Sequence, residues 1–333
     1  MIQEVVGCNM KRIRTAVVGT GRIVQDGYLP ALKILENKFD TIAVCNKNNR
    51  QKGIALSKEY NINYYNDYLE MLKKEELDFI IIATHAITHF EIAKHCIDYG
   101  VQLLIEKPVS VKSYDINVLR NISENNRIRV FSSFQRRFNP HINHLLDILD
   151  ENRIGEIQYI CCDNIHYRTQ EYFDNKKQGD LDGGGVLLNQ ALHSIDLLLY
   201  LFGELELVSS EISTIQHHIT YEDYAVIDFK TKLGVPIRFF ATTCAYKEKG
   251  YRLYIIGNKG EVVLYPNELH ITTQNCATSF VRSYNNSELF VFQLSSIYNC
   301  LVNCNIKDMD SRLCSLDDCF NSIRLVERIY EDK

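Results

Sequence analysis

The tripeptide Glu106-Lys107-Pro108 places a lysine directly after an apolar run that ends at Ile105. In an open α/β sheet, ligands bind beyond the carboxyl ends of the strands, so this lysine could reach both a cofactor and a substrate. A lysine that loses part of its water has a lowered pKa and can exchange a proton with a hydroxyl group. A surface lysine followed by a turn proline would give the same three residues, and the tripeptide alone leaves both interpretations open.

A second candidate pair, Asn189 and His193, stands in the apolar segment that follows Gly183-Gly184-Gly185. We predict a long helix from this glycine run to Phe202, on which two residues four apart share one face. Histidine can serve there as a general base, whereas asparagine can orient a hydroxyl group but takes no proton at neutral pH. Taken alone, a core histidine bonded to a backbone carbonyl is the simpler interpretation of His193.

A glycine-rich loop lies near the start of the chain. Gly19-Thr20-Gly21-Arg22-Ile23 follows the apolar run from Arg14 to Val18 and opens a helical pattern. Glycines at the first two positions let the backbone turn tightly and approach a pyrophosphate, which the N–H groups of a helix N-terminus can bind. Val24 stands where the strict fingerprint has its third glycine, so the motif is incomplete. Its place after the first strand still favours a nucleotide site.

The ribose of a bound dinucleotide usually meets an acidic residue at the end of the second strand. Asn46 holds that place, after the run from Thr41 to Cys45. Asparagine can donate and accept hydrogen bonds, and it lacks the charge that would repel a 2′-phosphate. Lys47 and Arg50 lie close by in the sequence, either as phosphate contacts or as solvated loop charges. We therefore expect NAD as the cofactor, with NADP as an open alternative.

Apolar runs alternate with helical patterns up to residue 134, which predicts βαβ units and a doubly wound parallel sheet covered on both faces. The predicted strands are 14–18, 41–45, 78–83, 101–105 and 129–134. The predicted helices include 68–77, 88–99 and 110–124, and Pro30 should break or kink an earlier one.

The rhythm changes after residue 134, and strand–turn–strand signals dominate from Leu207 to Thr273. We predict helices over 138–150 and 316–330, an extended segment over 156–165 and a loop over 302–310. The fold class is thus α/β plus α+β. A dinucleotide-binding domain spans residues 1–134, and a domain with an open, mostly antiparallel sheet spans residues 135–333.

Composition narrows the class of protein. The 333 residues suggest two domains, and 46% hydrophobic with 24% charged residues is typical of a globular chain. A net charge of -5 argues against nucleic acid or an anionic membrane as a partner. No apolar stretch approaches the roughly 20 residues of a membrane span, and the first residues do not resemble a signal peptide, so we expect a cytoplasmic protein.

The cysteines are expected to be packed thiols rather than a metal site. There are eleven, an odd number, scattered along the chain. The pairs Cys300/Cys304 and Cys314/Cys319 lack the tight spacing of a zinc knuckle. We therefore predict no bound metal.

In combination, these motifs resemble the glucose–fructose oxidoreductase / inositol dehydrogenase / MocA (Gfo/Idh/MocA) family of oxidoreductases. The resemblance covers nearly the whole chain and rests on Gly19-Thr20-Gly21, Asp78-Phe79-Ile80-Ile81-Ile82-Ala83-Thr84 with His89, Glu106-Lys107-Pro108, and the segment from Gly183 to Asp196. It implies a Rossmann domain joined to an open, mostly antiparallel sheet through which members form homodimers or homotetramers. It also implies NAD(P)-dependent hydride transfer on a hydroxyl group of a sugar, cyclitol or sugar nucleotide.

The resemblance further implies roles for single residues. The family's catalytic lysine, whose bond to the following proline is often cis, falls on Lys107, and its helical histidine falls on His193. Many members have aspartate in place of Asn189, so we expect His193 to take the proton and Asn189 to position the carbinol. Lys107 would stabilise charge on the same oxygen. Substrate contacts are expected from Lys107, Arg137, Arg168, Tyr172, Asn189 and His193, and further cofactor contacts from Thr84, His85, His89, Glu106 and Lys107.

Some of these assignments leave alternatives. Arg137 could form an interdomain salt bridge instead of a substrate contact, and Tyr172 could be a packing residue. His166 and Asp182 are weaker substrate candidates, and His85 stands where many members have proline.

Two other functions fit the same motifs. A non-catalytic dinucleotide-binding regulator would be expected to lose Lys107 or His193, and both are present. An enzyme that retains and recycles its cofactor would catalyse net epimerisation, elimination or glycoside cleavage. The substrate and the direction of the reaction stay open.

Overall fold

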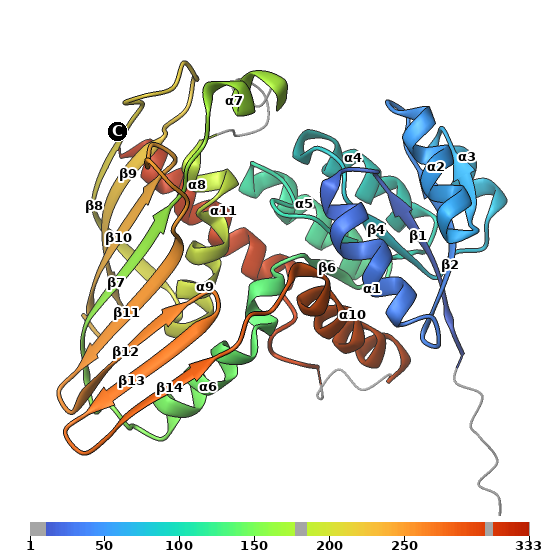
Figure 1. Ribbon diagram of the computed structural model, residues 1–333. Coiled ribbons are helices and arrows are strands. Elements are labelled where there is room, and N and C mark those ends of the chain that lie inside the picture. The colour runs from blue at the N-terminus through green and yellow to red at the C-terminus, as the bar shows by residue number, and fades with distance from the viewer. Residues whose placement is uncertain (1–10, 177–184, 304–308, 333) are drawn as a thin grey trace, which may run out of the picture.

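The first half of the chain forms a six-stranded parallel sheet in the order β3-β2-β1-β4-β5-β6. The computed structural model describes residues 11–176, 185–303 and 309–332 (Figure 1). The strand order is that of a dinucleotide-binding Rossmann sheet and confirms the predicted fold class. Its strands are β1 (Ile13–Val18), β2 (Phe39–Cys45), β3 (Asn63–Tyr65), β4 (Phe79–Ile82), β5 (Gln102–Ile105) and β6 (Val130–Ser132).

Helices cover both faces of this sheet (Figure 1). All four residues of β4 are fully buried, which explains the uninterrupted apolar run that predicted this strand. The helical segments are η1 (Val24–Tyr28, a π-helical turn), α1 (Leu29–Ile34), α2 (Arg50–Tyr60), α3 (Tyr68–Lys74), α4 (Ala86–Asp98) and α5 (Ser113–Asn125). The chain stays helical through Pro30, so the proline does not break the helix, but the π-helical turn η1 directly before it makes the helix irregular there.

The second half of the chain builds an eight-stranded sheet in the order β14-β13-β12-β11-β7-β10-β9-β8. Only β7 and β10 pair in parallel; the other neighbours are antiparallel, as predicted. The strands are β7 (Ile157–Ile165), β8 (Leu205–Ser213), β9 (Tyr224–Thr231), β10 (Pro236–Thr242), β11 (Gly250–Gly257), β12 (Gly260–Tyr265), β13 (Glu268–Thr273) and β14 (Ala277–Val281).

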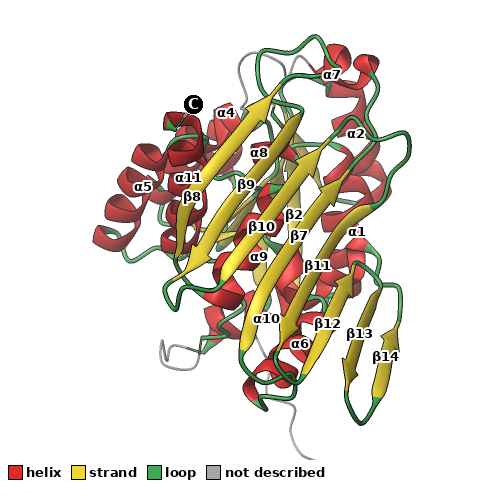
Figure 2. Cartoon of the chain, turned by 90° about the vertical axis from the view of Figure 1, so that its left-hand side faces the viewer, coloured by secondary structure: helices red, strands yellow, loops and turns green. Residues whose placement is uncertain are grey.

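One face of this sheet is covered, and the other is open. Along β9, buried residues alternate with half-buried ones, as expected for a sheet packed on one side. The covering segments are α6 (Pro140–Asp150), α8 (Val186–Asn189), α9 (Leu192–Phe202) and α11 (Leu316–Glu331). Figure 2 shows the opposite face without a covering helix in the described part of the chain. Assembly of a homodimer or homotetramer through this face stays a prediction.

Three local features differ from the predictions. The expected helix after the glycine run is two short helices, α8 and α9, with Gln190 and Ala191 between them. The helix expected from residue 138 begins at Pro140, after the 3₁₀ turn η2 (Gln135–Phe138). Helix α10 (Asn286–Val302) was not predicted and takes the first residue of the expected 302–310 loop. The short α7 (Gln170–Lys176) follows β7.

Helix α10 returns the chain to the first domain. Its Phe290 is fully buried, and its ring centroid lies 4.3 Å from that of Tyr28 in η1. A Cβ atom on Gly27 would lie only 2.6 Å from the Phe290 ring, so this contact requires glycine. We retain the division after residue 134 as a proposal, with α10 as an element of the later part that packs on the earlier one.

The described cysteines are all free thiols. Sγ of Cys314 and Sγ of Cys319 lie 3.6 Å apart in the core. Among the described residues, no helix is both long enough and apolar enough to cross a membrane.

We predict that Phe290→Ala lowers the free energy of unfolding by about 3–5 kcal/mol, because it opens a cavity against Tyr28 and the α1 segment. The measurement is urea denaturation followed by tyrosine fluorescence and circular dichroism. Phe292→Ala is the matched control, since Phe292 lies on the same helix with 37% of its surface exposed. Equal destabilisation by the two variants would contradict the packing role given to α10.

Candidate active site

The predicted cofactor residues gather at one edge of the parallel sheet. Gly19, Asn46, Thr84 and Glu106 follow β1, β2, β4 and β5 at or within two residues of the strand ends. These strands are neighbours and run in parallel, so their carboxyl ends meet at the same edge. The structure therefore brings together segments that lie far apart in the sequence.

The glycine loop turns tightly against β4. Gly19 has a φ of 122°, and a Cβ atom there would lie 2.2 Å from the carbonyl oxygen of Ala83. Gly21 and Arg22 are exposed, and a Cβ atom on Gly21 would meet nothing within 4 Å. Val24, at the third fingerprint position, is fully buried. The loop thus leaves open space at its tip, where a pyrophosphate would fit, and uses Val24 for packing.

Asn46 is tied to the glycine loop. Its side-chain amide donates a hydrogen bond to Oγ1 of the buried Thr20, and its Oδ1 accepts one from the Asn48 backbone at 3.1 Å. Lys47 and Arg50 are exposed beside it, and Arg50 is the first residue of α2. The position suits a ribose, and its surroundings are uncharged or positive.

The segment after β4 holds three predicted cofactor residues with different environments. Thr84 is half-buried, and its Oγ1 lies 2.7 Å from Oγ1 of Thr88. His85 is exposed at the N-cap of α4. His89 is buried, with Nδ1 2.9 Å from the Pro108 carbonyl oxygen and Nε2 3.2 Å from that of Thr84. His89 therefore fixes the backbone on both sides of the cofactor edge.

Glu106 lies within the protein beside two hydroxyl groups. The Tyr28 hydroxyl is 2.7 Å from Oε1 of Glu106 and 2.6 Å from Oγ of Ser133. Burial raises the pKa of Glu106, while Tyr28 and the neighbouring Lys107 oppose that rise. Through Tyr28 and Ser133, Glu106 thus links the end of β5 to η1 and to the segment after β6.

Lys107 reaches from the first domain into the second. Its Nζ donates a hydrogen bond of 2.6 Å to the backbone carbonyl of Asn189, and its bond to Pro108 is cis, as the family resemblance implied. Asn189 is the last residue of α8, while His193 belongs to α9. The two residues therefore do not share one continuous helix, and the spacing argument for their common face was wrong. A bend at Gln190 and Ala191 replaces it.

His193 is buried, with 8% of its surface exposed. Its ring meets that of Phe134 edge to face at 5.5 Å, and its Nδ1 has no hydrogen-bond partner among the described residues. Burial, together with the positive charges of Arg136 and Lys107, holds the pKa of His193 well below its usual 6.5. The imidazole is therefore neutral at physiological pH, the form that a general base needs.

Arg137 forms a structural ion pair, which was the alternative to a substrate contact. Its Nε and Nη2 donate to the two carboxylate oxygens of Asp196 at 2.8 and 2.6 Å, and both side chains are 2% exposed. Nη1 of Arg137 lies 3.6 Å from Asp318 in α11. The charge of Arg137 is thus compensated within the protein.

Arg136 is a site residue that the sequence did not single out. Its Nη1 lies 3.3 Å from Oγ of Ser194, the residue after His193, and its guanidinium lies 4.6 Å from the centre of the Tyr251 ring. Burial lowers the pKa of Arg136. The sequence could not show which of the two adjacent arginines faces the candidate site, because the partner of Arg137, Asp196, stands 59 residues away.

Arg168 and Tyr172 lie on the segment that leads from β7 into α7. Nη1 of Arg168 donates to Oε2 of Glu248 at 2.7 Å, and its guanidinium lies 5.2 Å from the centre of the Tyr172 ring. The Tyr172 hydroxyl accepts a weak hydrogen bond of 3.4 Å from Gln190, next to Asn189. The structure thus brings both predicted residues toward the Lys107–Asn189 contact. Asp182, Gly183 and Gly184 lie outside the described residues.

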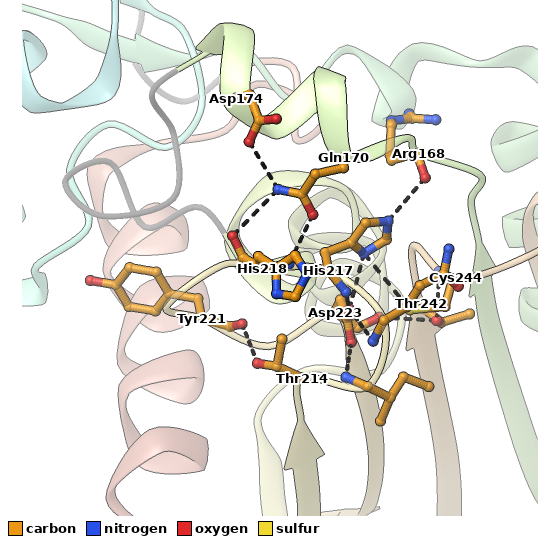
Figure 3. A network of polar contacts seen from close by, with 12 residues as sticks. Arg168, Gln170, Asp174, Thr214, His217, His218, Tyr221, Asp223, Thr242 and Cys244 are labelled. Carbon is orange, nitrogen blue, oxygen red and sulfur yellow. Dashed lines mark hydrogen bonds and ion pairs between the residues drawn. The ribbon is translucent and has the colours of Figure 1, made fainter.

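His217 fixes the backbone of this segment. Its Nε2 lies 3.0 Å from the carbonyl oxygen of Arg168, and its Nδ1 lies 3.0 Å from Oδ2 of Asp223 (Figure 3). Burial alone would raise the pKa of Asp223, but backbone N–H groups of residues 215–217 hold it below its usual value. The imidazole therefore links an anchored carboxylate to the loop that carries Arg168.

Cys244 joins this network and completes a set of three possible metal ligands. A ring nitrogen of His217, a carboxylate oxygen of Asp223 and Sγ of Cys244 all lie within 4.8 Å of one another. Burial raises the pKa of Cys244 to about 11. Cys244 Sγ also lies 3.6 Å from the Asp223 carbonyl oxygen, so hydrogen bonds link this residue to the His217–Asp223 pair.

Comparison with known proteins agrees with this geometry. The profile described as "Oxidoreductase family, NAD-binding Rossmann fold" matches residues 13–134, and that of the GFO/IDH/MocA C-terminal domain matches residues 142–263. The chain belongs to the GFO/IDH/MocA family. Its first matched profile is that of an oxidoreductase family with an NAD-binding Rossmann fold, so the chain is an oxidoreductase with an NAD-binding domain.

Three relatives illustrate the similarity. An uncharacterised oxidoreductase of Synechocystis sp. is 27% identical over 277 residues, which is 77% of this chain and 72% of the relative. Glucose-6-phosphate 3-dehydrogenase of Bacillus subtilis is 22% identical over 79% of this chain and 76% of its own. The WlbA dehydrogenase of Bordetella pertussis, solved with NADH and UDP-GlcNAcA, has a TM-score of 0.82 at 23% identity, over 97% and 96% of the two chains.

We predict that Asn46→Asp weakens NADPH binding about tenfold or more, because a carboxylate at this position repels a 2′-phosphate. NADH binding should change little, since a carboxylate can still bond the ribose hydroxyl groups. Fluorescence titration with both reduced cofactors measures the two affinities. Asn48→Asp, two residues further on and exposed, is the control for added charge. An equal loss of NADPH binding in both variants would contradict the placement of the ribose at Asn46.

Proposed function

We propose that this protein catalyses reversible hydride transfer between the nicotinamide of NAD(P) and a secondary carbinol of a sugar, cyclitol or sugar nucleotide. The observation that carries the proposal is the contact of Lys107 Nζ with the Asn189 carbonyl, beside the buried His193, at the carboxyl edge of the Rossmann sheet. The loop at Gly19 and Gly21 has the room and the backbone geometry for a pyrophosphate. When bound, the nicotinamide supplies the hydride acceptor or donor.

His193 is proposed as the base that takes the hydroxyl proton. Its lowered pKa keeps the imidazole neutral, and a buried Nδ1 without a partner among the described residues can accept a hydrogen bond from a carbinol. The ring is held by its edge-to-face contact with Phe134. Proton transfer from a bound hydroxyl would satisfy an atom that otherwise costs free energy to leave buried.

Lys107 is proposed to stabilise negative charge on the same oxygen. Its ammonium group is held by the Asn189 carbonyl, so its position is set before substrate arrives. Asn189 stands between Lys107 and the Gln190–Tyr172 contact, where its side chain can orient the carbinol. Tyr172 and Arg168 would bound the substrate on the side of α7.

We predict that Lys107→Ala lowers kcat for sugar oxidation at least about 100-fold while NADH affinity stays within a few-fold, because the charge acts on the reacting oxygen. Initial rates at 340 nm over a panel of aldoses, inositols, sugar phosphates and UDP-sugars give kcat, and fluorescence titration gives the affinity. Lys112→Ala, at the exposed N-cap of α5, is the control.

Full turnover by the Lys107→Ala variant would overturn this assignment. Cofactor that co-purifies with the unmodified protein and resists exchange, with products epimerised or cleaved rather than oxidised, would favour the cofactor-retaining alternative.

The lowered pKa of His193 makes a prediction about pH. A base must be deprotonated, so kcat/KM for oxidation of a neutral substrate should fall only below pH 6.5, as His193 becomes protonated. Arg136→Gln removes a repelling positive charge, which raises the pKa of His193 and moves this acidic limb to higher pH. Rate profiles from pH 5 to 9 measure the limb, with the exposed Arg238→Gln as control. An unchanged limb in an active His193→Gln variant would show that another group titrates.

A further inference from the structure

Arg136 carries a positive charge at the active site that no carboxylate of the described residues pairs within ion-pair distance. Among the described residues, its Nη1 bonds the Ser194 hydroxyl at 3.3 Å, and its guanidinium lies 4.6 Å from the centre of the Tyr251 ring. The neighbouring Arg137, in contrast, donates two hydrogen bonds, from Nε and Nη2, to the carboxylate of Asp196. A half-buried guanidinium without a counter-ion is unfavourable, so its presence beside the proposed reaction centre requires an explanation.

The nearby carboxylate, Glu248, is already engaged. Its Oε1 bonds Nδ1 of His166, and its Oε2 accepts hydrogen bonds from Arg168 at 2.7 Å and from the Tyr167 backbone at 3.1 Å. Burial lowers the pKa of Arg136, and the charge of Glu248 opposes that shift without an ion pair between the two residues in the described part of the chain. The cationic groups around His193 therefore exceed the carboxylates that could neutralise them within the described part of the chain.

Several buried polar atoms without hydrogen-bond partners lie on the strand of Tyr251 and on segments near it. Among the described residues, the Tyr251 hydroxyl, Nε2 of His166, Nε of Arg168 and the Thr243 hydroxyl are buried and unbonded. They lie on adjoining segments. His166 and Arg168 donate backbone hydrogen bonds to the carbonyls of Thr242 and Thr243, and Tyr251 pairs with Asn164 across β7 and β11. Buried polar atoms without partners indicate a site that can bind a polar ligand.

We propose that the substrate carries an anionic group, a carboxylate or a phosphate, on the same sugar unit as the reacting carbinol, and that Arg136 binds it. Arg136 bonds Ser194, the residue after His193, so its partner lies next to the reaction centre rather than at a distant nucleotide diphosphate. Stacking on Tyr251 leaves the edge of the guanidinium available for a two-point contact with carboxylate or phosphate oxygens. This inference rests on the proposed function and specifies its substrate class.

The test is calorimetric titration of the full-length, NAD-loaded protein with matched acidic and neutral ligands. The pairs are glucuronate and glucose, glucose 6-phosphate and glucose, and UDP-glucuronate and UDP-glucose. We expect the acidic member of at least one pair to bind ten times more tightly or better, with a preference that shrinks as salt rises. The carboxylate and phosphate pairs distinguish the two sources of charge.

Arg136→Gln should bring the two members of that pair to within threefold of each other and leave the neutral member unchanged. Arg136→Lys, which keeps the charge without the fork, should retain part of the preference and guards against a variant that folds poorly. Arg238→Gln, exposed on the outer sheet face, should behave as the unmodified protein. The inference is wrong if no acidic member binds more tightly than its neutral twin, or if Arg136→Gln keeps the preference.

The outcome is separable from that of the proposed function. An acidic preference that depends on Arg136, without hydride transfer to any ligand, would support the anion site and contradict the proposed reaction. Turnover of acidic and neutral twins in a ratio near one, with that ratio unchanged by Arg136→Gln, would overturn the anion site and leave the reaction standing.

Discussion

The buried ion pair between Arg137 and Asp196 fixes the geometry on which the active site depends. It joins η2, directly after the last strand of the Rossmann sheet, to α9, which carries His193 three residues before Asp196. Burial raises the pKa of Asp196, and the guanidinium opposes that rise through two hydrogen bonds. Removing one partner of such a pair leaves an uncompensated charge and costs about 3–5 kcal/mol. The position of His193, the proposed base, therefore depends on an ion pair formed one turn further along α9.

The Arg137–Asp196 ion pair leaves the adjacent Arg136 without a partner of this kind, so the two arginines have different roles. Because η2 directs Arg137 into the core, Arg136 points toward Ser194 and Tyr251 at the active site. Burial, with the charge of Arg136 and that of Lys107, lowers the pKa of His193 and keeps its imidazole neutral. The single turn η2 thus supplies both the Arg137–Asp196 ion pair and the charge of Arg136, which helps to lower the pKa of His193, the proposed base. The same field favours an anionic ligand, since each positive charge that disfavours imidazolium also attracts a carboxylate.

Local sequence was sufficient where one strand or loop decided the outcome. The run Phe79 to Ile82 is apolar because both of its faces are covered, and Lys107 follows a strand end because that edge binds ligands. Local sequence was insufficient where distant contacts decided it. Helix α2 buries only Gly53 and Leu56, so it has little apolar period to detect. The amphipathic pattern of α10 is likewise weak, because both η1 and η2 pack against it. The choice between Arg136 and Arg137 depended on Asp196, which no local pattern reveals.

The break between α8 and α9 explains how the site can keep its lysine without the aspartate expected at position 189. Lys107 bonds the backbone oxygen of Asn189, an atom that every residue type supplies. Ending α8 at Asn189 makes that carbonyl available, because the last carbonyls of a helix have no partner within it. The position of the ammonium group is therefore independent of whether residue 189 ionises. An aspartate there would add a negative charge beside Lys107 and offset part of the field that keeps His193 neutral. With asparagine, the whole positive field acts on the histidine and on whatever group the substrate presents to Arg136.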